Sequence, residues 1–395
     1  MRRAQAGVLA LRTREGRRRA LRWTLIGVAS VALLALLFLT LTRTGRYLAR
    51  AGWEESKILW RRRSIVKMVA DTSVPRATRR KLQLVLDARE FARRSLDLKV
   101  GNSFTTYSPL EHDTLVLVLS AAYRDRLENY GWWFPIVGRV PYKGYFDFGE
   151  AQADERNFVR RGFDTYLRPA SAFSTLGFFD DPVVSTTLKS DTLSLANTVI
   201  HELTHNTFYA RGQAEFNESF ANFVGARGSA DFFRWRRQPR AVEEAEARWS
   251  DEKILARFWK RLHDSIDSVF KAHPGNAAAP VRVALRDSVY RDARRDLVFR
   301  LGPQLRTVAP RYLERVRLDN AALLARRIYL TDLDLFDEVW VRERRDTRLT
   351  IQRVIELAKS DPKHPYDALR RWVSGGSGGS RGSSGGPRSA KATTD

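Results

Sequence analysis

Two histidines and a glutamate stand at helical spacing in the segment HELTHNTFYARGQAEFNESFANF, residues 201–223. His201 and His205 are four residues apart, so on a helix they share one face and can bind one tetrahedral zinc ion. Glu202 follows the first histidine, where its carboxylate can take the proton of a water molecule at the metal. Glu202 is therefore the candidate general base.

A second acidic residue extends this pattern, which is only moderately specific by itself. Glu218 follows His205 by thirteen residues, in NESFANF, which we predict to be a second helix after a turn at Gly212. Its carboxylate would be the third protein ligand, leaving the fourth position for water, as a catalytic zinc requires. Asn222, one helical turn further on, is predicted to orient a ligand imidazole. The alternative is that these residues are ordinary surface positions of two helices.

These helices must be positioned by the rest of the domain, which we predict to span residues 43–373. Helical periodicity runs from residue 51 to about residue 98, with a break at Pro75. Residues 114–120 are predicted to form a strand, and both 132–148 and 158–184 are predicted to form short strands and turns. We therefore divide the domain into an α/β part (43–190), the metal-site helices (191–228) and a helical lobe (229–373) that turns at Pro274-Gly275.

The N-terminal region predicts a membrane anchor. Residues 1–22 carry a net charge of +7. Residues 23–42 contain no charged residue, and this stretch is long enough for one helix to span a bilayer. The flank is more basic on the N-terminal side, which predicts a cytoplasmic N-terminus and a domain on the outer side of the bacterial inner membrane. At the other end, the Gly/Ser-rich residues 374–395 are predicted to be a disordered tail.

The overall composition excludes several classes of protein. The 395 residues contain no cysteine, which excludes disulfide scaffolds, cysteine zinc fingers and thiol nucleophiles. The net charge of +24 suggests nucleic-acid binding at first sight. However, residues 101–230, which hold the metal motif, sum to −4, whereas residues 43–100 sum to +10. We therefore assign the excess to anionic lipid head groups and predict no nucleic-acid partner.

The metal motif and several separate phrases together resemble a known family. HELTHNT followed by NESFA looks like the Glu-zincin metallopeptidases, and the stretch from about Tyr47 to Phe233 resembles the bacterial family of predicted zinc aminopeptidases. The phrases that carry the resemblance are RRRSIVKMVAD (61–71), LVLDAREFA (84–92), FPIVGRVPYKGYFDF (134–148), AFSTLGFFDDPVVST (172–186) and NAALLARRIY (320–329).

The resemblance implies a fold and a set of site residues. The fold is α+β and mainly helical, a zincin-like metallopeptidase fold with a small mixed sheet, an active-site helix and a helical C-terminal lobe. By analogy with other zincins, an edge strand would pair with the substrate backbone, although an ordinary buried strand is the equal alternative. Tyr329 is a candidate donor to the oxyanion, with a core tyrosine as the alternative. The proposed edge strand comprises Ala172, Phe173, Ser174, Thr175 and Gly177.

The function predicted from these features is a membrane-anchored zinc peptidase that binds one Zn²⁺ and acts on peptides, most simply as an aminopeptidase. An aminopeptidase needs an acidic group for the substrate's α-ammonium, and Asp180 and Asp181 are the candidates, although an Asp-Asp-Pro turn is as often a plain loop. The alternatives are a zinc endopeptidase of the same fold and a non-catalytic envelope scaffold. The sequence makes no prediction about the oligomeric state.

Overall fold

A computed structural model of the chain describes residues 14–111, 114, 116–134, 138–170 and 181–375. Two compact units make up the chain. Unit 1 comprises Met1–Arg61 and Trp132–Val140, and unit 2 comprises Arg62–Gly131 and Pro141–Asp395. The proposed edge strand at 172–177 and Asp180 lie outside the described residues, as does nearly all of the predicted tail.

Unit 1 contains two helices and a hairpin. Helix α2 (Arg14–Leu41) is followed directly by α3 (Arg43–Trp60), and β4 (Trp132–Phe134) pairs antiparallel with β5 (Gly138–Val140). The Phe134 ring of the hairpin lies 5.4 Å from the Tyr47 ring of α3, measured between centroids. The part of α2 from Arg17 to Leu41 is long and apolar enough to cross a membrane, a property that membrane anchors share with signal sequences.

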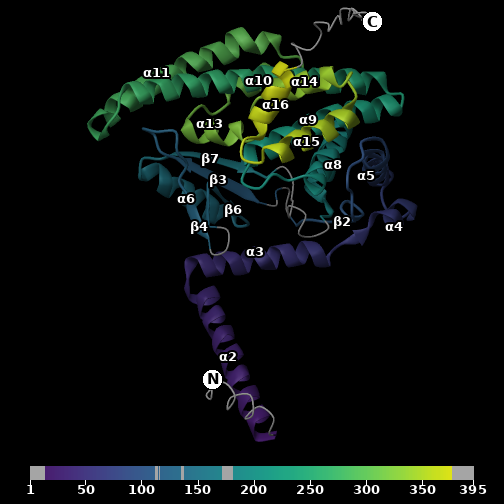
Figure 1. Ribbon diagram of the computed structural model, residues 1–395, viewed down its shortest axis with the longest axis vertical. Coiled ribbons are helices and arrows are strands. Elements are labelled where there is room, and N and C mark those ends of the chain that lie inside the picture. The colour runs from purple at the N-terminus through teal and green to yellow at the C-terminus, as the bar shows by residue number, and fades with distance from the viewer. Residues whose placement is uncertain (1–13, 112–113, 115, 135–137, 171–180, 376–395) are drawn as a thin grey trace, which may run out of the picture. The chain divides into compact units, whose positions relative to one another are not determined.

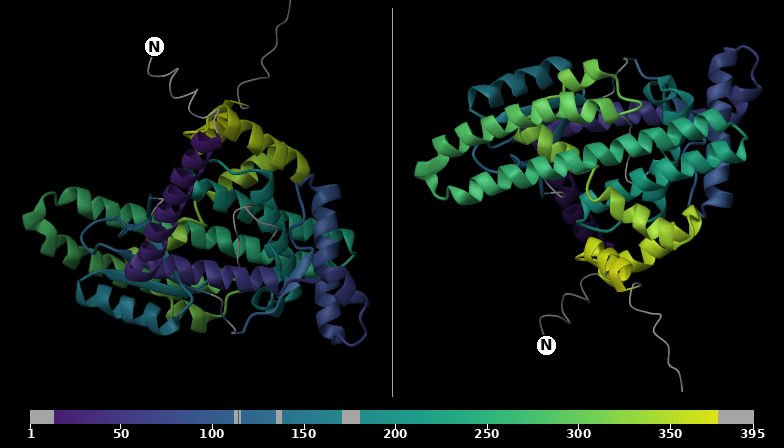
Figure 2. Two further views of the ribbon diagram at one scale, coloured as in Figure 1. Left: turned by 90° about the horizontal axis from the view of Figure 1, so that it is seen from below. Right: turned by 90° about the horizontal axis from the view of Figure 1, so that it is seen from above.

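Unit 2 is mainly helical (Figure 1). The long helices α10 and α11 pack against each other, as Figure 2 shows from two sides. The predicted turn at Pro274-Gly275 separates them. The helices of this unit are α4 (Ile65–Ala70), α5 (Arg76–Ser95), α6 (Phe148–Arg160), α7 (Ser185–Lys189), α8 (Thr192–Thr207), α9 (Ala214–Trp235), α10 (Pro239–Ala272), α11 (Ala279–Arg295), α12 (Pro310–Glu314), α13 (Asn320–Arg327), α14 (Leu333–Arg342), α15 (Thr347–Ser360) and α16 (Pro365–Gly375), with 3₁₀ turns at Asn276–Ala278 and Gly302–Gln304 and a π-helical turn at Asp296–Leu301.

Two small sheets complete unit 2. In the first, β3 (Leu117–Ala122) lies between the antiparallel strands β6 (Tyr142–Tyr145) and β7 (Asp164–Pro169). In the second, β2 (Thr106–Ser108) pairs antiparallel with β1 (Arg63–Ser64) and parallel with β8 (Val183–Val184). The small sheet content and the predominance of helix agree with the predicted α+β class, but only the second sheet is mixed.

Helices cover both faces of the first sheet. Successive residues of a strand point to opposite faces. On β7, the Thr165 hydroxyl donates to Glu155 of α6 at 3.2 Å, whereas the Tyr166 ring lies under the guanidinium of Arg326 in α13, 5.9 Å away. Helices α6 and α13 therefore pack on opposite faces, and α13 lies on the face that carries Tyr166.

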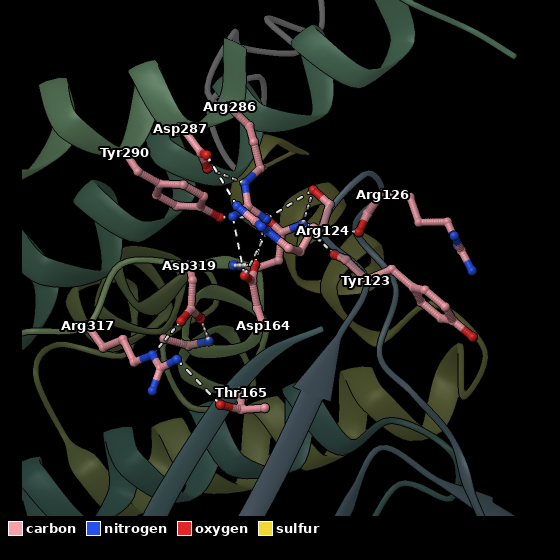
Figure 3. Close-up of polar contacts among 12 residues, drawn as sticks. Tyr123, Arg124, Arg126, Asp164, Thr165, Arg286, Asp287, Tyr290, Arg317 and Asp319 are labelled. Atoms are coloured by element: carbon pink, nitrogen blue, oxygen red, sulfur yellow. Dashed lines mark hydrogen bonds and ion pairs between the residues drawn. The ribbon is translucent and has the colours of Figure 1, made fainter. Parts of the chain in front are cut away.

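A buried polar network fastens α11 and α13 to this sheet (Figure 3). The carboxylate of Asp164, the first residue of β7, accepts from Arg286 of α11 at 2.5 Å. It also accepts from the backbone N–H of Asn320, the first residue of α13, at 3.1 Å. The Asn320 side chain accepts from the Tyr290 hydroxyl at 2.7 Å and donates to the Tyr123 carbonyl at 2.7 Å. One carboxylate thus connects a strand with two helices from distant parts of the sequence.

The prediction of strands and turns from residue 158 was wrong at its start, because Phe158 lies in α6. The helix begins where Asp147 caps it, accepting from the Glu150 N–H at 2.9 Å. It buries Ala151 and Phe158, which are seven residues apart and so lie on one face. The aromatic and glycine content around it, which suggested strands, belongs to its neighbours β6 and β7.

Candidate metal centre

Helix α8 carries the two histidines and is strongly specified by its sequence. Asp191 caps its N-terminus, accepting from the Ser194 N–H at 2.9 Å. The apolar face of α8 packs into the main core of unit 2. His201 follows directly after Ile200 of that face, and His205 lies one helical turn further along. The buried apolar residues of this face are Leu193, Leu195, Ala196, Val199, Ile200 and Leu203.

A short turn brings α9 back against α8 and so places Glu218. Gly212 in this turn has φ +76°, a left-handed conformation that favours glycine. The Asn217 side chain bridges the turn: it accepts from the Ala210 N–H and donates to the Ala210 carbonyl, both at 2.8 Å. The predicted turn at Gly212 and the second helix are therefore present, and Glu218 lies one turn into α9.

The three predicted ligands converge. The Nε2 atoms of His201 and His205 are 3.3 Å apart. The Glu218 oxygens lie 3.4 Å from Nε2 of His201 and 3.6 Å from Nε2 of His205. Ligands about 2.0–2.1 Å from a tetrahedral zinc are about 3.3–3.4 Å from each other. Each histidine approaches a different oxygen of the Glu218 carboxylate, at close to the spacing of zinc ligands. Within the described residues, His201, His205 and Glu218 form a cluster that could hold a metal ion.

The charges of the cluster also favour a cation at its centre. Burial acts to raise the pKa of Glu218, but the two imidazoles beside it lower that pKa to about 2. Burial acts to lower the pKa of His201, but the carboxylates of Glu218, Glu202 and Glu252 raise it. An anionic carboxylate thus faces the His201 imidazole, whose pKa is raised. A divalent cation would supply positive charge instead and would bind both nitrogens as neutral ligands.

Glu202 lies beside the cluster on α8. It is partly exposed, and its carboxylate acts electrostatically on His201. It follows His201 by one residue and precedes His205 by three, so it lies at the edge of the ligand face. This position suits a group that exchanges a proton with a water molecule at the centre.

Tyr329 and Asn222, which were predicted to have separate roles, are in direct contact. The Asn222 side-chain amide donates to the backbone carbonyl of Tyr329 at 2.7 Å. Burial raises the pKa of the Tyr329 phenol, the charge of Glu218 raises it further, and the charge of Arg168 opposes both. The phenol therefore lies within electrostatic range of Glu218. Asn222 holds the end of the α13 segment that carries Tyr329, a contact that the prediction of an imidazole partner did not foresee.

Three residues near the cluster were not predicted from the sequence. Arg168 of β7 places its guanidinium carbon 5.8 Å from the centre of the Tyr329 ring. Burial raises the pKa of the Tyr142 phenol at the start of β6, and Glu218 raises it further. Burial raises the pKa of Glu252 in α10 to about 7, which His201 opposes. The sequence signal available was weak: Arg168 and Tyr142 lie in short strands, and Glu252 is one of many charges along α10.

The predicted substrate-binding residues are only partly covered by the structure. Ala172, Phe173, Ser174, Thr175, Gly177 and Asp180 lie outside the described residues. Asp181 is buried, and its backbone carbonyl accepts from the Phe104 N–H at 2.8 Å. Its role in binding the substrate stays a prediction.

The fold and the site define a mainly helical domain with a His-His-Glu cluster able to hold a metal ion. Residues 46–369 match the family described as "Putative aminopeptidase", and because the match covers most of the chain, this protein belongs to that family. No curated protein and no solved structure matches the chain.

Proposed function

We propose that the protein is a zinc-dependent aminopeptidase with a zincin-like catalytic domain. The observation that carries the proposal is the convergence of His201, His205 and Glu218 into one cluster that could hold a metal ion, in a chain whose family is named for aminopeptidases. When bound, zinc polarises the scissile carbonyl and makes water a stronger acid. Two imidazoles and a carboxylate suit zinc, and cobalt or manganese would also fit this donor set.

Two protein groups would move or share protons in the reaction. A carboxylate oxygen of Glu202 takes a proton from the attacking water as the new C–O bond forms. The same oxygen then gives the proton to the amide nitrogen as the C–N bond breaks, so the base is regenerated. The Tyr329 phenol donates to the carbonyl oxygen, whose negative charge grows as water adds. The positive charge of Arg168 lowers the pKa of the phenol, which favours this donation.

Substituting Tyr329→Phe tests the oxyanion role. Removing one oxyanion donor costs about 10²–10³ in kcat, and we expect KM and bound zinc to change little because Tyr329 is not a ligand. Steady-state kinetics and metal analysis of the full chain measure this. Tyr312→Phe is the matched control, since Tyr312 is an exposed tyrosine of α12. If Tyr329→Phe retained the wild-type kcat, Tyr329 would be only a packing residue.

The choice between exopeptidase and endopeptidase depends on how the substrate's α-ammonium is held. Glu252 is a candidate acceptor, because it is an acidic group surrounded by protein on α10 and lies within electrostatic range of His201. An ammonium group placed beside it would favour its ionised form. Acetylation of the peptide removes that charge, so it separates the two activities.

We expect the full chain to cleave a free-amino peptide and to lose this activity in a chelator. We expect it to cleave the N-acetylated form of the same peptide poorly. Mass spectrometry of the products measures both. Glu252→Gln should raise KM for the free peptide and reduce the preference for it, whereas Glu243→Gln, an exposed glutamate of the same helix, should not. Equal cleavage of free and acetylated peptides would establish an endopeptidase, and cleavage that resisted chelators would contradict metal dependence.

We also propose that α2 anchors the protein in the bacterial inner membrane, with the N-terminus cytoplasmic and the catalytic domain outside. Support comes from the apolar span Arg17–Leu41 and from the +7 charge of residues 1–22. A phosphatase that is active only outside the cytoplasm, fused to the C-terminus, checks the orientation. Lack of phosphatase activity in a stable fusion would contradict it.

A further inference from the structure

The junction between α2 and α3 is a built corner rather than a loose linker. The Thr42 hydroxyl caps α3 by accepting from the Gly45 N–H at 2.8 Å. Arg46 of α3 donates to the last carbonyls of α2, those of Thr40 at 3.1 Å and Leu41 at 3.2 Å. A Cβ at position 45 would collide with the Phe38 carbonyl oxygen, so Gly45 permits the close approach of the two helices. Figure 1 shows that α3 turns steeply away from α2 at this corner.

The two sides of α3 have different surroundings. Tyr47 contacts Phe134 of the β4–β5 hairpin, and Ile58 is buried. Trp53 and Trp60 are seven residues apart, so they share one face, and they are 61% and 86% exposed. At 100° per residue, that face points well away from Tyr47. In Figure 1, β4 lies above α3 and α2 runs below it.

The chemistry of the exposed face matches a membrane surface. Tryptophan is enriched where the hydrocarbon meets the head groups, because its ring is apolar and its N–H is polar. Residues 43–63 carry a net charge of +5, which complements anionic lipids. A helix that leaves a membrane span at a steep angle lies along the membrane surface, and α3 follows the apolar span of α2 directly.

We propose that α3 is an interfacial helix, lying on the lipid surface at the end of α2 with Trp53 and Trp60 inserted among the head groups. The hairpin face of α3 then points away from the lipid. The inference rests on the proposed anchoring of α2 and does not need the peptidase proposal.

The absence of cysteine allows a direct test, because a single cysteine can be introduced and labelled with a nitroxide without background. We would label the full chain at Trp53→Cys or Trp60→Cys and reconstitute it in vesicles of phosphatidylcholine and phosphatidylglycerol. Collision with oxygen, which concentrates in lipid, is compared with collision with a water-soluble nickel chelate. Trp133→Cys is the matched control, since Trp133 lies on the hairpin of the same unit and is also 61% exposed. Leu33→Cys, within α2, is the reference for lipid.

We expect the oxygen-to-nickel collision ratio at positions 53 and 60 to be severalfold higher than at 133 and closer to the ratio at 33. Equal ratios at 53, 60 and 133 would overturn the proposal. Labels at 53 and 60 that neither reagent reaches would also overturn it, because the face would then be covered by protein. A water-like ratio at position 33 would also overturn the proposal, because it would show that α2 does not lie in the bilayer. Far-UV circular dichroism of each variant confirms that its helices are intact.

Discussion

Glu202→Gln should reduce peptide hydrolysis by about 10²–10⁴-fold, the usual contribution of general acid–base catalysis. The amide is nearly the same size as the carboxylate, but it cannot take the proton of the attacking water at neutral pH. Glu202 lies at the edge of the ligand face of α8 and is not one of the three converging groups. Bound zinc should therefore remain near the wild-type amount. Single-turnover kinetics with metal analysis of the same samples measures both quantities.

Two further variants distinguish a lost base from a damaged site. Glu218→Ala removes a candidate ligand that approaches both imidazoles, so it should lose zinc and activity together. Glu215→Gln changes a half-exposed glutamate one turn earlier on α9 and should retain both. Wild-type turnover by Glu202→Gln would contradict the mechanism. Loss of zinc from Glu202→Gln would instead make Glu202 part of the metal site.

The convergence of the three candidate ligands could be predicted because local spacing determines most of it. Residues four apart on a helix share a face whatever the rest of the fold does. This spacing alone therefore places the imidazoles of His201 and His205 side by side. Glu218 follows after a short link whose glycine and asparagine specify the turn: Gly212 takes the left-handed conformation, and Asn217 bridges the turn through Ala210. The thirteen residues from His205 to Glu218 therefore carry most of the information that places the third candidate ligand.

The surroundings of the centre could not be predicted, because they come from distant segments. Arg168 reaches Tyr329 from a strand 161 positions earlier in the chain, and its strand is too short to show a strong pattern. Glu252 acts on His201 from α10, 51 positions later in the chain. Only the packing of the helices and the sheet decides which of the many charged residues approach the centre.

Asn222 shows that helical spacing predicts where a side chain lies on a helix but not which group it binds. Its spacing from Glu218 correctly placed it one turn away on α9, but spacing alone could not name its partner. In the structure its amide holds the backbone of Tyr329, 107 residues later. The residue therefore links the metal helix to the end of α13, so the position of α13 matters for the site.

The position of α13 depends in turn on the buried network around Asp164. Its carboxylate accepts from the first backbone N–H of α13 and from Arg286 of α11, as Figure 3 shows. The Arg286 side chain is only 3% exposed and that of Asp164 10%. Both charges are thus shielded from water, and each relies on the other for compensation.

Arg286→Met should destabilise this region by about 3–5 kcal/mol, because removing one partner leaves a buried charge without its main compensation. The loss should appear locally as faster amide hydrogen exchange in β7 and α13, by about a hundredfold or more for a change of that size. Exchange of the full chain followed by mass spectrometry measures it. Activity should fall as well, since α13 leads to Tyr329.

Two controls show whether the effect comes from the buried charge. Arg257→Met breaks a pair with Asp334 in which the side chains are 50% and 42% exposed, so it should cost at most about 1 kcal/mol. Adding Asp164→Asn to Arg286→Met removes the uncompensated carboxylate and should recover part of the lost protection. If Arg286→Met left exchange in α13 at the wild-type rate, the network would be incidental to the placement of α13, and Tyr329 would have to be positioned by Asn222 and its own packing.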